Sequence, residues 1–243
     1  MLSILFVREI LCLAMLSIGA YYDLKTREVN DRLWMVFGAA GLVLYPWEYV
    51  SGATADVQMI LVSVSLTAAI AVALYRYSFF GGADAKALMA ISAIMPVYYS
   101  PSTFYVHPIT GIMVLTNAVL FAMAVPLYNA LSNLVRVTRG GRIFEGFDEP
   151  VWRKVLACFV GAPSIGQKCH HSAIECAADE KKKFSFRLNN DEAFSKDGCH
   201  SRIPANGPVW LSQNLPFLVF LLAGFLAAML FGDLLLTTML RYQ

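Results

Sequence analysis

Long apolar segments alternate with short polar ones over most of the chain. Six segments are apolar enough to form membrane helices: residues 2–22, 32–49, 57–77, 84–99, 109–135 and 215–240. A helix needs about 20 residues to cross the hydrocarbon core of a bilayer, so the second and fourth segments are short. Runs of this length favour helices over a barrel, because backbone polar groups in lipid must be satisfied within the structure. We therefore predict six transmembrane helices.

One polar segment interrupts this pattern near the C-terminal end. Residues 136–202 hold 21 charged side chains, 12 of them basic, whereas the remaining 176 residues hold only 15. Within this segment, residues 181–188 alternate polar and aromatic positions, which is typical of a short strand. The predicted fold is an all-α polytopic membrane protein with a small α+β or β-rich cytoplasmic insert. Helices 1–5 occupy residues 1–135, the insert residues 136–213, and helix 6 residues 214–243.

The composition agrees with a membrane protein. Hydrophobic residues make up 58% of the chain and charged residues 15%, against roughly 25% charged in a soluble domain. This excludes a soluble globule, a coiled coil and a disordered chain. The net charge of +2 gives no indication of nucleic-acid binding, and we expect none. The first apolar segment lacks a basic stretch before it, so we expect it to be retained rather than cleaved as a signal peptide.

The positions of the basic residues predict the orientation in the membrane. Of 19 Lys and Arg residues, 17 fall in alternate connections: three in the first, two in the third and 12 in the insert. The second and fourth connections have none. Because cytoplasmic loops are enriched in Lys and Arg, we expect a multi-pass protein of the cytoplasmic membrane. The first loop, the third loop and the insert would face the cytoplasm, with both termini outside.

Two carboxylates lie on the cytoplasmic face under this topology. Asp23 ends the first apolar segment and Asp84 begins the fourth. Ionisable residues at membrane depth are costly and commonly mark functional sites. Each also has a plain structural interpretation. Asp84 follows Gly81, Gly82 and Ala83, and could simply cap a helix, while Asp23 could belong to a solvated loop.

The surroundings of both residues favour the functional interpretation. Segments 23–33 (DLKTREVNDRL) and 80–88 (FGGADAKAL) resemble the two motifs of the archaeal preflagellin and type IV prepilin peptidases, membrane aspartic proteases of the GxGD class. The resemblance extends over nearly the whole chain, and the large insert before the last helix is similar to that of the preflagellin branch. It implies that Asp23 and Asp84 are the catalytic pair, with Lys86 at the lysine position of the second motif.

The resemblance also implies roles for neighbouring residues. Gly81 and Gly82 would let an extended substrate backbone approach closely, while Ala83 occupies the position directly before the second aspartate, where the family has glycine. Glu28 and Asp31 lie on the face that would receive a basic leader, although both are equally typical of a solvated loop. Lys86 itself is expected to extend towards the cytoplasmic interface.

The activity implied by the resemblance is removal of a short basic leader, a class III signal peptide, from preflagellin (archaellin) or type IV prepilin precursors just before their hydrophobic helix. Two neighbouring carboxyl groups do not both ionise easily, so they share a proton. One can take a proton from water while the other supports the carbonyl oxygen. The expected partners are these precursors and the lipid bilayer, with no cofactor or metal. We expect a helix rearrangement or the substrate to bring the pair together.

Other interpretations stay open at this point. Membrane carboxylates also relay protons in small transporters, although a transporter more often shows repeated, interrupted helices. A pilus or flagellum assembly protein without enzymatic activity is a further alternative. A zinc site in the insert is conceivable but matches no familiar spacing, and Asp233 is expected at the outer membrane interface. The residues considered as zinc ligands are Cys169, His170, His171, Cys176, Cys199 and His200.

Overall fold

The computed structural model describes residues 4–50, 56–99, 107–165, 171–178, 181–186 and 208–241. It divides into two compact units. We call the first, Met1–Ala122 with Pro216–Gln243, the helical unit, and the second, Met123–Leu215, the insert unit. The described residues are mostly helical, as the apolar pattern predicts.

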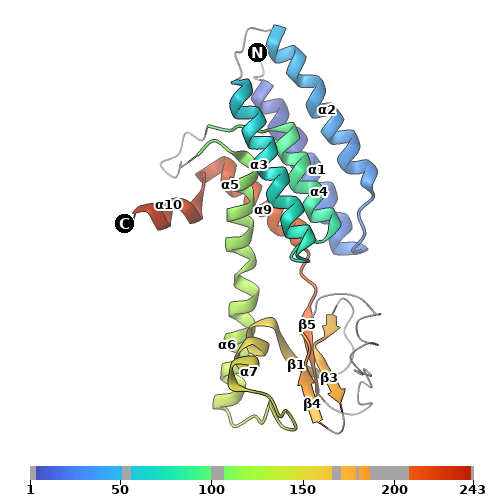
Figure 1. Ribbon diagram of the computed structural model, residues 1–243, viewed down its shortest axis with the longest axis vertical. Helices are drawn as coiled ribbons and strands as arrows, with labels where there is room; N and C mark the ends of the chain where they lie inside the picture. The colour runs from blue at the N-terminus through green and yellow to red at the C-terminus, as the bar shows by residue number, and fades with distance from the viewer. Residues whose placement is uncertain are drawn as a thin grey trace. The chain divides into compact units, whose positions relative to one another are not determined.

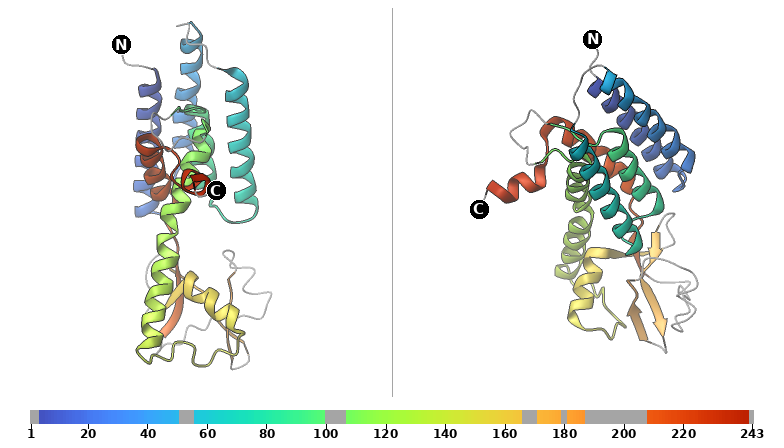
Figure 2. Two further views of the ribbon diagram at one scale, coloured as in Figure 1. Left: turned by 90° about the vertical axis from the view of Figure 1, so that its left-hand side faces the viewer. Right: turned by 45° about the horizontal axis from the view of Figure 1, so that its top comes forward.

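The helical unit is a bundle whose first four helices run alternately up and down (Figures 1 and 2). Helix α9 packs extensively against both α5 and α1, while α4 packs against α2 and α3. The elements of this unit are α1 (Ile4–Lys25), α2 (Asp31–Val50), α3 (Val57–Arg76), α4 (Gly82–Ile94), α5 (Thr110–Ala122), α9 (Phe217–Phe231) and α10 (Leu234–Arg241).

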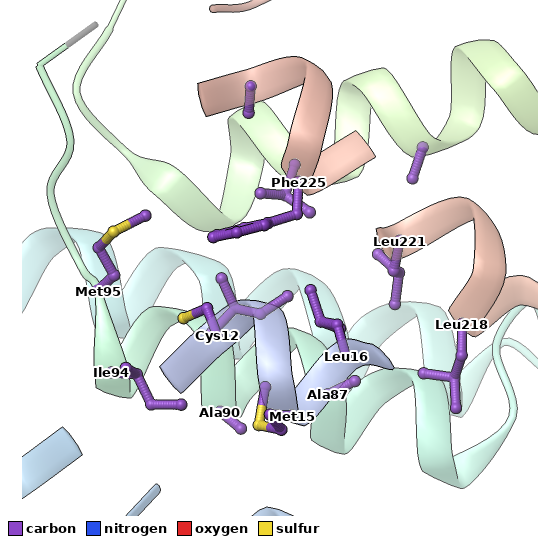
Figure 3. Packing of buried hydrophobic residues seen from close by; sticks show 14 of the residues in the cluster. Cys12, Met15, Leu16, Ala87, Ala90, Ile94, Met95, Leu218, Leu221 and Phe225 are labelled. Atoms are coloured by element: carbon purple, nitrogen blue, oxygen red, sulfur yellow. The ribbon is translucent and has the colours of Figure 1, made fainter. Parts of the chain in front are cut away.

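The core of the helical unit forms where α1, α4 and α9 meet (Figure 3). Its side chains are apolar and almost wholly buried, whereas large apolar side chains such as Val43 and Trp47 on α2 are 71% and 70% exposed. An apolar outer surface of this kind is what a lipid environment requires, and close packing then holds the helices together. The labelled core residues are Cys12, Met15 and Leu16 of α1, Ala87, Ala90 and Ile94 of α4, Met95 after it, and Leu218, Leu221 and Phe225 of α9.

A buried ion pair joins three of these helices. Arg8 of α1 is 3% exposed, and its guanidinium donates two hydrogen bonds to the carboxylate of Glu48 on α2, at 2.9 and 3.2 Å. The same side chain donates to the carbonyl oxygen of Ile94, at the end of α4. A buried charge requires such partners, because leaving it unpaired in an apolar interior is strongly unfavourable. The pair therefore ties α1, α2 and α4 together at one end of the bundle.

Three helical stretches in the described chain are long and apolar enough to cross a membrane. They are α1, α3 and Thr110–Thr138, which comprises α5 and α6 (Ala124–Thr138). Helices α4 and α9 have 13 and 15 residues, fewer than the roughly 20 that span a bilayer. The helical membrane fold is thus supported, but the predicted number of six spans is not confirmed.

The last apolar segment forms two helices instead of the single one predicted over 215–240. Gly232 ends α9 with a φ of 86°, a left-handed conformation that glycine adopts readily at helix ends. Asp233 then accepts the Leu236 amide hydrogen at 2.8 Å and begins α10. Asp233, for which the outer membrane interface stays the predicted depth, is fully buried within the protein, with Thr116 donating a hydrogen bond to it at 2.9 Å and His107 Nε2 3.5 Å away.

The insert unit contains both helices and strands, as predicted for a small α+β insert. Helix α7 (Val151–Val160) leads into β1 (Gly161–Ile165), which pairs with β5 (Pro208–Gln213) in an antiparallel sheet of order β1-β5-β2, where β2 is His171–Ala173. The strands β3 (Glu175–Ala178) and β4 (Lys181–Phe184) form a separate antiparallel pair. Strand β4 confirms the start of the strand predicted over 181–188, and residues 187–188 lie outside the described chain.

Aromatic packing forms the small core of the insert unit. Trp210 and Phe184 are 1% and 2% exposed, and the rings of Phe147 and Phe184 stack at 4.2 Å between centroids. The indole of Trp210 donates a hydrogen bond to the Ile143 carbonyl oxygen at 3.1 Å, so its polar group is satisfied inside the core.

Because α9 contacts α5 closely at Gly224, alanine should destabilise the protein at this position but not at Gly38. A Cβ at Gly224 of α9 would lie 2.6 Å from the Val114 carbonyl oxygen and 2.7 Å from the Ala118 amide nitrogen of α5. Gly224→Ala should therefore destabilise the protein by about 1–3 kcal/mol. At Gly38 of α2 a Cβ would meet nothing within 4 Å, so Gly38→Ala should be neutral or stabilise by up to about 1 kcal/mol. Thermal unfolding in detergent, followed by circular dichroism, measures both, and equal midpoints would contradict the close packing of α5 and α9.

Candidate active site

Both motif aspartates lie at the same end of the helical unit. Asp23 is in the last turn of α1 and Asp84 is in the first turn of α4. The turn between α1 and α2 and the turn between α3 and α4 lie at this end in both views of the bundle (Figures 1 and 2). The up-and-down arrangement of the first four helices thus brings together residues that are 61 positions apart in the sequence.

Asp23 is bound at the start of α9. Its Oδ2 accepts a hydrogen bond from the Leu218 amide at 3.3 Å, and its Oδ1 lies 3.8 Å from a terminal nitrogen of the Arg27 guanidinium. The first amide hydrogens of a helix have no partner within the helix and carry partial positive charge. The end of α1 is therefore attached to the start of α9 through a carboxylate, whose side chain is 14% exposed.

Asp84 folds back onto the turn that precedes α4. Its Oδ2 accepts the Gly81 amide hydrogen at 3.1 Å, which is the bond expected of an acidic residue in a first helical turn. A Cβ at Gly81 would lie 3.1 Å from the same oxygen, so the absence of a side chain there leaves room for the carboxylate. Ala83 is an ordinary helical residue of α4, and alanine at this position carries no cost of positive φ.

The first turn of α9 lies beside both aspartates. The ring of Phe217 contacts that of Phe80, just before α4, with 4.7 Å between centroids, while the next residue, Leu218, binds Asp23. The carboxyl groups of Asp23 and Asp84 are close enough to interact electrostatically. None of the hydrogen bonds between described residues joins them directly.

Lys86 makes an ion pair that the sequence did not indicate. Its ammonium lies 2.7 Å from both carboxylate oxygens of Asp31, in the first turn of α2, and the two side chains are 46% and 61% exposed. Lys86 is therefore paired at the surface and has no ion pair with Asp23 or Asp84 among the described residues. Glu28 is exposed in the preceding turn, and its carbonyl oxygen accepts a hydrogen bond from the Thr26 hydroxyl.

An apolar cavity of about 440 Å³ lies between α2 and α4 beside this ion pair. By helical periodicity its α4 side chains, which include Lys86 and Ala93, lie on the face of the helix opposite to Asp84. The cavity is therefore separated from Asp84 by α4 itself. It is lined by Asp31, Trp34, Met35, Gly38, Lys86, Met89, Ala90 and Ala93.

Two parts of this site were not singled out from the sequence: Arg27 and the amide of Leu218. Arg27 lies four residues after Asp23, the spacing at which side chains on a helix meet, and this signal could have identified it. No sequence signal predicts that the backbone of a residue 195 positions away binds Asp23. Of the residues considered as zinc ligands, His171 and Cys176 lie in β2 and β3, and the other four lie outside the described residues. No cluster of three possible ligands occurs within the described part of the chain.

The comparisons with known proteins agree with the resemblance of segments 23–33 and 80–88 to the peptidase motifs. The family model of the type IV leader peptidase family matches residues 10–127, a region that contains both aspartates. A preflagellin peptidase of Methanocaldococcus jannaschii is 26% identical over 236 residues, covering 90% of this chain and 91% of that protein. A preflagellin peptidase of Methanococcus voltae is 23% identical over 237 residues, covering 93% of this chain and 95% of that protein. The chain is therefore similar to the type IV leader peptidase family over the region that contains both aspartates, and to preflagellin peptidases over at least 90% of its length.

Proposed function

We propose that this protein is a membrane aspartic endopeptidase of the GxGD type that removes the leader peptide from preflagellin. The match to the model of a peptidase family supports proteolysis over transport or a purely structural role in assembly. The similar proteins of three methanogens, each named preflagellin peptidase and each matched over at least 90% of this chain, support the substrate class. Type IV prepilins are the second candidate substrate, because they carry the same class of leader.

The single observation that carries the catalytic assignment is the arrangement of the two motif aspartates around the first turn of α9. Hydrolysis of a peptide bond needs one group to remove a proton from water and another to protonate the carbonyl oxygen. Two carboxyl groups that interact at close range suit this task, because one keeps a proton that the other gives up. Asp23 and Asp84 come from different helices and lie at the same end of the bundle, so a movement of α1 against α4, or the substrate, would bring them into contact.

The placement in the membrane follows from the distribution of basic residues. We propose six spans, with the shorter helices α4 and α9 crossing only part of the bilayer within the bundle. The active site and the insert, residues 136–213, would face the cytoplasm, with both termini outside. A leader with basic residues on the cytoplasmic side would then arrive at the end of the bundle that holds Asp23 and Asp84.

The acidic residues Glu28 and Asp31 are the proposed contacts of the basic leader. Asp31 is already paired with Lys86, so a basic residue of the precursor would have to replace Lys86 as its partner. Both side chains of this pair are largely exposed, and an exposed ion pair contributes about 1 kcal/mol at most. Such an exchange of partners is energetically accessible.

Asparagine substitutions test the catalytic pair. Asp23→Asn and Asp84→Asn keep the size of each side chain but remove its proton transfer, so each should reduce cleavage of preflagellin in detergent or liposomes at least 1000-fold. Asp56→Asn is the matched control, since Asp56 caps α3 at the end of that helix opposite to Arg76, and it should cleave normally. Thermal unfolding checks that all three variants fold. Normal cleavage by the Asp84→Asn variant would remove Asp84 from the mechanism.

The ion pair of Lys86 predicts an effect on binding rather than on chemistry. Lys86→Met frees Asp31 and should lower the KM for a precursor with a basic leader, whereas Asp31→Asn should raise it several-fold. In both variants kcat should stay within about threefold of wild type, because neither side chain has an ion pair with the catalytic pair. A precursor with glutamine in place of its basic leader residues should respond to neither change. A fall in kcat comparable to that of Asp84→Asn would show that Lys86 takes part in catalysis.

A further inference from the structure

Arg27 adopts an unusual conformation directly after α1. Its φ is 59°, in the left-handed region that residues with a Cβ rarely occupy. The side chain turns back along the helix end, and a terminal guanidinium nitrogen lies 3.8 Å from Asp23 Oδ1. The side chain is 26% exposed, and its Nε is buried with no acceptor among the described residues. Backbone strain and an unpaired donor thus occur in one residue whose charge faces Asp23.

Lys25, in the last turn of α1, is a basic residue near Arg27 whose charge stays exposed to solvent. Its ammonium lies over the ring of Tyr21 and contacts the Tyr21 hydroxyl at 3.3 Å, and the residue is exposed. Long basic side chains usually keep their charge in water in this way. Arg27 gives up part of this hydration, and a buried donor without an acceptor is unfavourable. An electrostatic interaction with the Asp23 carboxylate is the evident compensation.

The two aspartates therefore have unequal surroundings. Asp23 has a cation and the Leu218 amide hydrogen near its two oxygens, and both favour the carboxylate form. Asp84 has the Gly81 amide hydrogen but no ion pair with a cation among the described residues, since Lys86 is paired with Asp31. If one proton is shared between the two groups, these contacts place it on Asp84.

The remaining charges near the pair do not remove this inequality. Helix α9, whose start binds Asp23, has no titratable side chain along Phe217–Phe231. From α4 the facing titratable group is Asp84 itself, whereas Asp31 of α2 is paired with Lys86 beside the cavity on the opposite face of α4. Arg27 is thus the cation that distinguishes Asp23 from Asp84 within the described helical unit.

We propose that Arg27 is a positioning residue that keeps Asp23 ionised, so that Asp23 is the general base and Asp84 the general acid of the reaction. This assignment rests on the function proposed above. Asp23 takes a proton from water as the water oxygen bonds to the carbonyl carbon, while Asp84 gives its proton to the carbonyl oxygen. Asp23 then passes its proton to the amide nitrogen as the C–N bond breaks, and one hydroxyl of the intermediate returns a proton to Asp84. Both groups end in their starting forms.

The pH profile of kcat/KM for preflagellin cleavage tests this role, because it reports the ionisation of groups in the free enzyme. Loss of a neighbouring positive charge makes a carboxyl group harder to ionise. In Arg27→Gly the acid limb of the profile should move up by about one pH unit. Below this limb the variant should be about tenfold slower than wild type, and at higher pH its activity should recover. Glycine also relieves the strain at φ 59°, so the variant should unfold no earlier than wild type.

Two further variants separate electrostatics from structure. Arg27→Lys keeps the charge and should restore the acid limb to nearly its wild-type position. Lys25→Gln removes one positive charge from the end of the same helix, at a side chain that does not face Asp23, and should leave the limb unchanged. A profile of Arg27→Gly that is lower at every pH but not shifted would overturn the proposed role. A shift of equal size in Lys25→Gln would do the same, since it would show a general effect of net charge.

The results that would overturn the role of Arg27 differ from those that would overturn the proposed function. Absence of preflagellin cleavage by the folded wild-type enzyme, or normal cleavage by Asp23→Asn, overturns the function and the role of Arg27 together. Cleavage by wild type that depends on Asp23 but has the same pH profile in Arg27→Gly overturns the role of Arg27 alone.

Discussion

The packing of α9 against α1 and α5 is the contact on which the candidate site depends. Gly224 allows the backbone of α9 to approach that of α5, and Leu218, Leu221 and Phe225 fill the space towards α1 and α4. Within this packing the first turn of α9 lies where α1 ends and α4 begins. The Leu218 amide then binds Asp23, and the Phe217 ring contacts Phe80. Helix α9 thus links the end of α1, which carries Asp23, to the residue before α4.

This arrangement uses helix ends, where the backbone has unsatisfied groups, as the place for chemistry. Asp23 binds an amide hydrogen at the start of α9 and Asp84 binds one at the start of α4. Each carboxyl group is thus oriented by a backbone amide at a helix start, and neither depends on the other for its position. The ion pair of Arg8 and Glu48 restrains the same helices at a separate point.

Hydropathy and charge patterns predicted much of this structure, since they reflect local properties. The helices α1, α2 and α3, the mixed fold of the insert and the shared end of Asp23 and Asp84 all follow from segment length and alternation. The sequence pattern did not predict the break of the last segment at Gly232. Hydropathy averaged over 215–240 is high, and it does not register one glycine with positive φ or one aspartate that caps the next helix. The burial of Asp233 and the inward turn of Arg27 were missed because both depend on tertiary partners.

We propose that Asp23 and Asp84 belong to one site at the start of α9. Cysteine pairs at positions 23 and 84, in a chain whose native cysteines are replaced and which still folds, test it most directly with a short bifunctional maleimide. We expect a cross-link between 23 and 84 that increases when preflagellin is added, and none between 56 and 84, because position 56 lies at the far end of α3. Failure of the 23–84 pair to react, with or without preflagellin, would contradict a common site.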